Sequence, residues 1–519
     1  MQDNDDISPV TDGSERPAPR IVTAPTHEIW EASAMRRWWP LTAVCLGSFM
    51  LIVDTTVVTV ALPDIAGDVH ASLGAMQWVM NIYTLALGVL TLSAGSIGDL
   101  FGHRAVYAGS VALFALASLA CGLAANESVL IAARGVQGIG GAAMFVTSVA
   151  LLGTHYSDKA RGVAIGVWSA VVGAAAAVGP VFGGLLIQYL GWRAIFFINL
   201  PLSLVTLALT LAFVTATPRR AGATVDGPGI LAFGVCSGLL TYALISAGDE
   251  GFARAQVIVL LAASAVALVA FVLIERRRRQ PMLDLGLFRS RSFSSLMFCV
   301  TASAWAFACL VFTSVWLQSL LGLSPLQSGA VLLPLAVTSF LVSTFVGRVL
   351  HKVSPRVTIG LSLFLLAVGS ALVSLMLRPD SGWQALLPGL AIIGAGVGIG
   401  IPAGGAAVLA SVPPERAGMG SGTMASFRQL GQSLGVAVLG LVFQAGSGAW
   451  GGGGIGASVE SVAKGVRPIE LVQAGASGLS RVYVVSAVVA AVGFVLAVSF
   501  IRKPPAVAPA EPVPAASAK

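Results

Sequence analysis

The sequence predicts an all-α membrane protein with 14 transmembrane helices, arranged as two six-helix bundles with an inserted helix pair between them. Fourteen apolar stretches fill the chain, and each is long enough to cross a bilayer, which takes about 20 residues at helical rise. Hydrophobic residues make up 56% of the chain and charged residues only 10%, a balance that excludes a water-soluble globule. Lysine and arginine fall almost entirely in alternate gaps between the stretches.

The predicted elements follow these stretches in chain order. The first six spans occupy 39–215, the inserted pair occupies 228–274, and the last six spans occupy 293–501. A strongly basic linker, 275–292, is expected to lie along the inner membrane surface, where anionic lipid attracts it. The fourteen spans are 39–62, 75–97, 105–125, 128–152, 162–189, 194–215, 228–247, 255–274, 293–318, 328–350, 357–377, 384–410, 418–444 and 482–501.

A faint internal repeat supports the arrangement in two halves. GSIGDLFGHR, from Gly95 to Arg104, follows the second span, and GRVLHKVSPR, from Gly347 to Arg356, follows the tenth. The first glycine and the last arginine of the two loops align. The loops are eight spans apart, which equals a six-span repeat plus an inserted pair.

The basic residues predict that both chain ends are cytoplasmic. With that orientation, the cytoplasmic segments hold 22 of the 30 lysines and arginines, and the external gaps hold six. Arg134 and Arg428 complete the total and lie inside spans. Residues 1–38 and 502–519 are predicted to be disordered cytoplasmic tails, and no cleaved signal peptide is expected. The net charge of +7 follows from this topology, so we expect no nucleic-acid partner.

The sequence carries no signature of an enzyme or of a cofactor site. The five cysteines all lie inside apolar spans, and neither they nor the five scattered histidines have metal-ligand spacing. The GxxxxGK loop of nucleotide-binding proteins is absent. We therefore expect no metal, no cofactor and no enzymatic activity, and any energy source must be an ion gradient.

Six motifs occur in order along the chain. They are LIVDTTVVTVALP from Leu51, GSIGDLFGHR from Gly95, RGVQGIGGA from Arg134, VGPVFGG from Val178, WLQSLLGLSPLQSGAVLLP from Trp316 and VPPERAGMGSGTMASFRQLGQSLG from Val412. Together they resemble the major facilitator superfamily and, within it, the fourteen-span drug:proton antiporters. The second, third and fourth are similar to the superfamily's loop motif, its fourth-span motif and the fifth-span motif of its exporters.

This resemblance implies a proton-coupled antiporter that exports hydrophobic or amphipathic drugs or antibiotics across the cytoplasmic membrane by alternating access. Its partners would be small-molecule substrates, protons and membrane lipid, and a monomer is expected. Two alternatives stay open. A carrier that exports one specific metabolite or lipid-like solute would share the scaffold, and a non-transporting membrane sensor or scaffold would share the spans without needing Asp54 and Arg134.

Asp54 is the one acidic residue deep inside a predicted span. An ionised carboxylate in hydrocarbon costs several kcal/mol, so it must face a cavity, pair with a cation or take a proton. Counted inward from Pro63 and Glu127, Asp54 and Arg134 lie about 13 Å and about 10 Å from the outer ends of their spans. We therefore expect Asp54 to carry or gate the proton, with Arg134 as its partner. The alternative is a permanent ion pair that only holds two helices together.

Gln137, Arg428 and Gln432 are candidate polar residues of a central cavity. Arg428 lies twelve residues past Arg416, near the midplane of span thirteen, and no carboxylate of the second half matches it. It would either bind an anionic or carbonyl group of a substrate or, in the interpretation we favour, act in structure or gating, because the family carries an arginine there. With one deep carboxylate in the chain, strongly dicationic substrates are disfavoured.

The fifth-span motif contains Gly179, Pro180, Gly183 and Gly184. Glycines four residues apart allow close helix contact, and Pro180 removes a backbone hydrogen bond and so permits a bend. From the resemblance to exporters we expect a pliant helix between the two halves, with ordinary tight packing as the alternative.

In the loop motif, Gly95, Asp99, Gly102 and Arg104 are expected to form a gating latch. Asp99 adds an acidic partner to the basic Arg104 at a helix end, and Gly102 allows a sharp turn and Gly95 close packing. The alternative is that Arg104 only marks the membrane topology. His103 stands where the family more usually has arginine or lysine.

Overall fold

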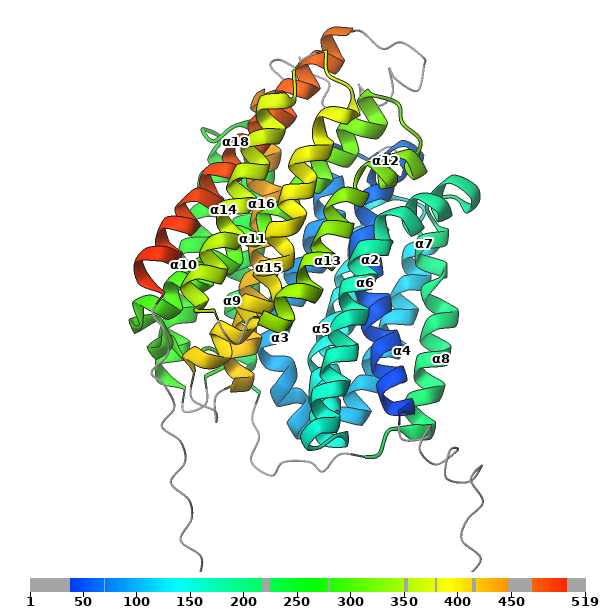
Figure 1. The fold of residues 1–519 in the computed structure, drawn as a ribbon, viewed down its shortest axis with the longest axis vertical. Coiled ribbons are helices and arrows are strands. Elements are labelled where there is room, and N and C mark those ends of the chain that lie inside the picture. Colours follow the sequence, from blue (N-terminus) through cyan, green and yellow to red (C-terminus); the bar gives the residue numbers. More distant parts are fainter. Residues whose placement is uncertain are drawn as a thin grey trace, which may run out of the picture.

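The computed structural model describes residues 38–69, 71–216, 225–278, 281–349, 353–378, 380–412, 417–446 and 469–501. Within these ranges the regular structure is helical, with no strand. Eleven of the described helices are long and apolar enough to cross a membrane, and the number rises to 13 if each of two bent pairs counts as one span. The protein is therefore an all-helical, multi-pass membrane protein, whose helices run roughly along its long axis (Figure 1).

The helices of the first half of the chain pack mainly against one another. They are α2 (Trp39–Val69), α3 (Leu73–Phe101), α4 (His103–Gly122), α5 (Glu127–His155), α6 (Asp158–Leu190), α7 (Ala194–Phe197) and α8 (Asn199–Phe213). The most extensive contacts join α5 to α3 and α4, and join α2 to α6 and α8. Helices α2, α4, α5 and α8 also contact one another and contribute to a shared interior.

The helices of the last third form a second group. They are α11 (Arg291–Val315), the π-helical turn η2 (Trp316–Leu320), α12 (Pro325–Val331), α13 (Leu333–Val349), α14 (Pro355–Met376), the 3-10 turn η4 (Trp383–Leu386), α15 (Leu387–Ser411), α16 (Ala417–Gly446) and α18 (Ile469–Phe500). Here α14 packs on α15 and α18, and α11 packs on α16 and α18. The two groups meet where α3 contacts α16 and where α6 contacts α12 and α13.

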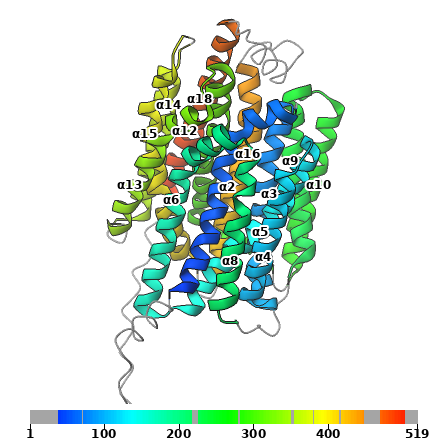
Figure 2. The ribbon, with the colours of Figure 1, turned by 90° about the vertical axis from the view of Figure 1, so that its right-hand side faces the viewer.

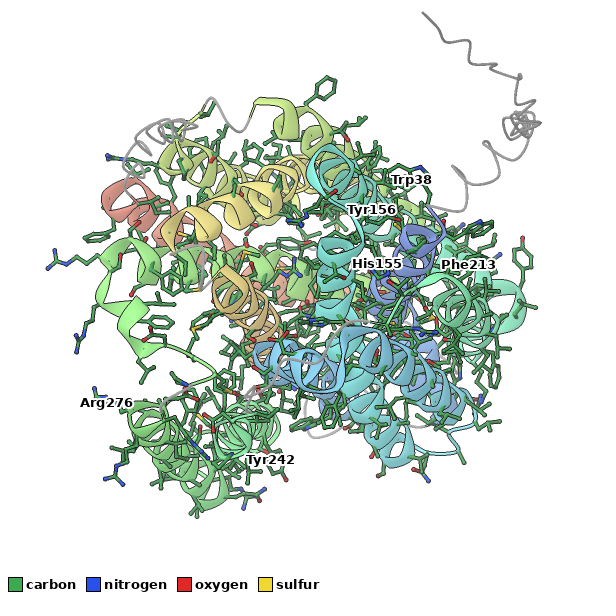
Figure 3. All side chains as sticks on the ribbon, turned by 90° about the horizontal axis from the view of Figure 1, so that it is seen from below. Trp38, His155, Tyr156, Phe213, Tyr242 and Arg276 are labelled. Atoms are coloured by element: carbon green, nitrogen blue, oxygen red, sulfur yellow. The ribbon has the colours of Figure 1, made fainter. Side chains whose placement is uncertain are left out.

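The inserted pair lies on one flank of the molecule. It consists of α9 (Gly227–Glu250) and α10 (Ala255–Arg277), followed by the 3-10 turn η1 (Leu285–Arg289). Helix α9 packs on both α3 and α16, so it covers the seam between the two groups, while α10 packs mainly on α9 (Figure 2). Seen from below, the pair with Tyr242 and Arg276 lies at the edge of the molecule (Figure 3). An apolar groove of about 690 Å³ lies between α3 and α9 and is lined by residues of both helices.

Side-chain caps explain where several helices begin. The side-chain oxygens of Ser72, Asn126, Asp226, Ser290 and Ser324 each accept a hydrogen bond from the backbone N–H three residues further on. Serine, asparagine and aspartate are favoured at this position because a helix leaves its first N–H groups without partners. These caps place the helix starts within a few residues of the apolar stretches.

Prolines explain the breaks and bends inside predicted spans. The predicted span 194–215 is two helices, α7 and α8, because Pro201 cannot donate the hydrogen bond that would continue the helix through Ile198. Helix α6 bends by 45° just before Val178, where Pro180 cannot bond to the carbonyl four residues earlier. The chain also bends by 41° between α12 and α13, next to Pro334.

Two details of the predicted spans differ from the structure. Helix α18 begins at Ile469, not at the predicted residue 482, because the helix continues beyond its apolar stretch and packs on other helices there. A methyl group at Gly478 would lie 2.8 Å from the carbonyl oxygen of Phe443 in α16, which shows how closely this extension packs. The described residues also give 11 to 13 candidate spans, fewer than the predicted 14. Helix α16 is the predicted span that does not satisfy the length and hydropathy criteria. The predicted tails, apart from Trp38, lie outside the described residues.

Candidate functional site

Asp54 lies in the middle of α2, with its carboxylate buried between α2 and α5. Its Oδ2 atom is 2.6 Å from Nη1 of Arg134, and neither side chain is exposed. The two residues predicted to share a depth therefore form an ion pair. Because both side chains are buried, each charge depends on the other and on the hydrogen bonds around them.

Three polar side chains from other helices complete the surroundings of Asp54. Its Oδ1 atom accepts hydrogen bonds from Nε2 of Gln137 at 2.9 Å and from Nδ2 of Asn199 at 3.1 Å. Both amides also donate to Oγ of Ser118, at 2.9 and 3.3 Å. We call Asp54, Arg134, Gln137, Asn199 and Ser118 the Asp54 cluster. It joins α2, α4, α5 and α8 at a single buried point, and all five residues are at most 2% exposed.

The guanidinium of Arg134 is held from several sides. Its Nη1 also donates to Oε1 of Gln137 at 2.7 Å, and its Nε donates to the carbonyl oxygen of Val79 at 3.3 Å. The guanidinium carbon lies 4.0 Å from the ring centroid of Tyr83, a cation–π distance. The Nη2 atom is buried and has no hydrogen-bond partner among the described residues. Arg134 thus keeps one free donor beside an otherwise satisfied carboxylate.

This arrangement gives the cluster two chemical states. With Asp54 ionised, both carboxylate oxygens are satisfied and the buried charges balance. With a proton on Asp54, the pair loses its negative member and Arg134 would be left as a buried cation without a counter-ion. Because an unpaired buried charge is strongly unfavourable, protonation must be accompanied by a rearrangement or by another anion.

The fifth-span glycines make two different sets of contacts. A methyl group at Gly183 would lie 2.7 Å from the side chain of Val57 in α2, and one at Gly179 would overlap Thr56. At Gly184 the methyl would instead lie 2.6 Å from the carbonyl oxygen of Pro325 in α12. Pro180 lies on the same contact, because its carbonyl faces Gly329 of α12. The motif therefore packs α6 against α2 of the first group and α12 of the second at the same time.

The distance between α6 and the second group of helices increases from this contact toward the N-terminus of α6. Gly184, Gly173 and Gly166 lie eleven and seven residues apart, on one face of the helix. A methyl at Gly184 would touch α12, and at Gly173 the nearest atom, in Phe340 of α13, would be 3.9 Å away. At Gly166 nothing described lies within 4 Å. The groups are in contact near the C-terminal end of α6 and apart near its N-terminal end.

The loop motif joins α3 to α4 through Gly102, whose φ of 91° only glycine adopts without strain. Asp99 interacts with His103, the Nε2 atom lying 3.2 Å from Oδ1, and not with Arg104. Arg104 donates from Nη2 to the carbonyl oxygen of Leu211, at the end of α8, at 2.8 Å. The motif therefore ties two helix ends of the first group. The packing of Gly95 lies outside the described contacts.

Other contacts close the same end of the first group. Trp38 stacks on Tyr156 with ring centroids 5.3 Å apart, and His155 accepts a hydrogen bond from the Thr215 N–H at 3.0 Å. Figure 3 shows Trp38, His155, Tyr156 and Phe213 gathered at this end. The ends of α2, α4, α5 and α8 are thus joined to each other, so the first group behaves as one packed unit.

The predicted cavity residues do not all lie together. Gln137 belongs to the Asp54 cluster and is fully buried. Arg428 and Gln432 lie on α16 and are half-buried, and none of the described contacts of the Asp54 cluster comes from α16. Arg428 has no acidic partner within the described part of the chain. It therefore keeps a charge that no described carboxylate balances.

Comparison with known proteins identifies the family. Residues 44–436 match the family model of the Major Facilitator Superfamily. The chain belongs to this superfamily. It is 38% identical to the multidrug resistance protein Stp of Mycobacterium tuberculosis, over 78% of this chain and 75% of that protein. It is 36% identical to the tetracenomycin C resistance and export protein of Streptomyces glaucescens, over 79% and 77% of the two chains. The puromycin resistance protein pur8 of Streptomyces alboniger is also 36% identical, over 78% and 82%.

Solved structures show the same fold. A bacterial homolog of the human lysosomal transporter Spinster, in an inward-facing and unoccupied conformation, superposes with a TM-score of 0.62 at 20% identity, over 90% of this chain and 98% of that chain. The human organic anion transporter MFSD10 gives a TM-score of 0.58 at 15% identity, over 89% and 99%. This member of the superfamily is therefore a transporter with drug- and antibiotic-resistance relatives, and not an enzyme.

Two members of the Asp54 cluster, Asn199 and Ser118, are absent from the sequence predictions. Both are small polar residues, and such residues are common in apolar spans, so their type alone does not distinguish them. Asn199 is the first residue of α8, two residues before Pro201, and this position does not point to Asp54. Its contact with Asp54, 145 residues away, follows only from the packing of α8 on α2.

Proposed function

We propose that this superfamily member exports small hydrophobic or amphipathic drugs or antibiotics across the cytoplasmic membrane in exchange for protons, by alternating access. Three relatives carry resistance or export in their names, at 36–38% identity over more than three quarters of this chain. No cofactor is needed, since the proton gradient supplies the energy. The transporter works as a monomer surrounded by membrane lipid.

We further propose 14 spans with both termini cytoplasmic. The described helices supply 13 spans when the bent pairs are counted, and α16 would be the fourteenth. It has 30 residues and packs between α3 and α11, so it runs beside helices that satisfy the span criteria. Its lower hydropathy fits a helix that is shielded from lipid by its neighbours and carries Arg428, Gln429 and Gln432.

The Asp54 cluster is the observation that carries proton coupling. Asp54 pairs with Arg134 inside the first group of helices, with neither side chain exposed. Protonation of Asp54 would remove one charge of this pair and so change the forces between α2 and α5. In our proposal this change is linked to the switch between outward-open and inward-open states.

The interface between the two groups supplies the moving part. Helix α6 contacts α12 at one end and separates from α13 toward the other, and both α6 and the α12–α13 segment bend by more than 40°. With the proposed topology, the separated end is cytoplasmic, and we propose that this arrangement is an inward-open state. We propose that the bends at Pro180 and Pro334 let the contact reverse during transport, and that the loop motif with Asp99 and Arg104 fastens the cytoplasmic end of the first group.

The experiment that tests this function uses inverted membrane vesicles with an imposed proton gradient. A panel of lipophilic dyes and antibiotics is added while the internal pH is followed, for the wild type and for Asp54→Asn. The matched control is Asp68→Asn, which removes an acid from the same helix at an exposed ion pair with Arg193. We expect substrate-triggered proton movement in the wild type and the control, and none in Asp54→Asn.

Three other outcomes would contradict parts of the proposal. Full proton-coupled export by Asp54→Asn would exclude Asp54 as the coupling residue. A response to one compound alone would point to a carrier of one specific metabolite. No transport of any compound by the wild type would contradict the proposed drug-export function.

A further inference from the structure

A second pair of acidic residues lies buried in the inserted helix pair, far along the chain from Asp54. Asp226 caps the N-terminus of α9 and is 6% exposed, and Glu275 lies in the last turn of α10 and is 3% exposed. The proposed function makes no use of either residue. Both lie beside an apolar cluster that includes Phe233, Phe271 and Met282.

Each of these carboxyl groups has one satisfied oxygen and one unsatisfied oxygen. Oδ1 of Asp226 accepts from the Gly229 N–H at 3.0 Å, and Oε2 of Glu275 accepts from the Leu283 N–H at 3.2 Å. Oδ2 of Asp226 and Oε1 of Glu275 are buried and have no donor among the described residues. Burying a carboxylate oxygen without a donor is costly, so both oxygens require an explanation.

The two unsatisfied oxygens lie next to each other. A methyl group added to Gly229 would lie 2.7 Å from both of them, so glycine is the residue that leaves room for the pair. Both carboxyl groups therefore face the same point beside the backbone of Gly229. Two ionised carboxylates can only accept, so a hydrogen bond between them requires that one holds a proton. A single proton would therefore satisfy both oxygens at once.

The charge balance of Asp226, Glu275 and Arg278 also requires one proton. Arg278 lies with Nε 3.3 Å from Oδ1 of Asp226 and supplies one positive charge. Two ionised carboxylates beside it would leave one uncompensated negative charge in a buried site. One proton makes the group of three neutral, as buried charges require.

The other charged groups around the pair leave this balance intact. On α10, Arg276 and Arg277 are exposed. In the linker, Oδ1 of Asp284 accepts from the Gly286 N–H at 2.8 Å. Helix α3 carries one acidic residue, Asp99, which has His103 as its partner, and α16 carries one basic residue, Arg428.

We propose that Asp226 and Glu275 form a binding site for a single proton, separate from Asp54, which fastens α9, α10 and the following linker together. Asp226 holds the start of α9, and Glu275 joins the end of α10 to the backbone of Leu283. With the shared proton bound, these three segments are linked through one hydrogen-bonded pair. Loss of the proton places two like charges side by side and weakens the link. This inference does not depend on the transported substrate or on the role of Asp54.

Infrared spectroscopy of the purified full-length protein, titrated from mildly acidic to alkaline pH, tests the site. We expect a C=O stretching band of a protonated carboxylic acid in the wild type. The part of this band that belongs to the site should be lost from Glu275→Gln and from Asp226→Asn. It should persist in Asp54→Asn, which removes the other proposed proton site, and in Asp284→Asn, which removes an acid from the same linker. Glu275→Gln keeps a donor for Asp226 and should fold, so the loss of the band in this variant reports on the proton and not on unfolding.

Thermal unfolding provides a second measurement on the same proteins. Near neutral pH the folded wild type would hold this proton, whereas both carboxyl groups are ionised in the unfolded chain. Because the folded state binds more protons, its stability should fall as the pH rises through the titration of the site. This fall should be smaller in Glu275→Gln. A band that persists in both Glu275→Gln and Asp226→Asn would overturn the proposal. So would its absence from the wild type at every pH, or its loss in only one of the two variants.

Discussion

Asp54 and Asp68 lie on the same helix, and each faces an arginine in a different environment. The Asp54–Arg134 pair is fully buried, whereas the side chains of Asp68 and Arg193 are 47% and 40% exposed. Water screens the outer pair and can solvate either partner alone. The inner pair has no such alternative, so the two arginines should differ widely in their contribution to stability.

This difference gives a prediction for single substitutions. Arg134→Ala leaves Asp54 as an unpaired buried charge and should lower the free energy of unfolding by about 3–5 kcal/mol. Arg193→Ala, the matched control, should cost about 0–1 kcal/mol, as exposed ion pairs do. Unfolding of both purified variants in detergent would measure the difference. Equal losses for the two variants would show that the Asp54 cluster is not the dry, strongly coupled site described above.

At the residue scale the sequence predicts the ion pair but not the whole cluster. Asp54 and Arg134 are conspicuous because charges are rare in apolar spans, and helical rise alone places them at a similar depth. Their contact also depends on how α2 and α5 are rotated, which the sequence does not reveal. Asn199 and Ser118 join the cluster through the packing of α8 and α4, and no spacing rule connects them to Asp54.

At the scale of single elements, α6 carries the contact between the two groups of helices. Its C-terminal part packs on α2 through Gly179 and Gly183 and on α12 through Gly184. At Gly184 glycine is required because a side chain would meet backbone atoms of Pro325 and Leu326 in α12. The same helix carries Gly166, where a methyl group would meet nothing.

Gly184→Ala and Gly166→Ala therefore form a matched pair on one helix. Gly184→Ala should separate α6 from α12 and reduce export severalfold, since the closed end would no longer seal. Gly166→Ala should leave export near the wild-type level. Initial rates of dye export from cells expressing each variant at equal level would measure this. Wild-type export by Gly184→Ala would show that the close approach of α6 to α12 is not needed for transport.

The elements themselves were predicted to different degrees. Apolar stretches located the helices well, because crossing a bilayer requires a run of apolar residues of fixed length. They missed the break between α7 and α8, where Pro201 interrupts an otherwise apolar run, and the early start of α18. Helix α18 begins within a polar stretch, and its first turns are held by packing against α16 and η2.

For the whole molecule, the separation between the two groups is what the sequence could not predict. If access alternates, the same sequence must support at least two packings of α6 against α12 and α13. The apolar pattern is the same in both packings, so it cannot predict which of them the structure adopts. The inserted pair was predicted from the chain order, but its position over the seam between α3 and α16 is a result of the structure. There it spans the boundary between both groups.

In the proposed mechanism, substrate binding is linked to the release of a proton from Asp54. Calorimetry of substrate binding to the purified transporter, repeated in buffers of different ionisation enthalpy, counts the protons released on binding. We expect proton release by the wild type and by Asp68→Asn, and none by Asp54→Asn, with Asp54→Asn still folded. Equal proton release by the wild type and Asp54→Asn would contradict the proposed role of Asp54 and assign the coupling to another group.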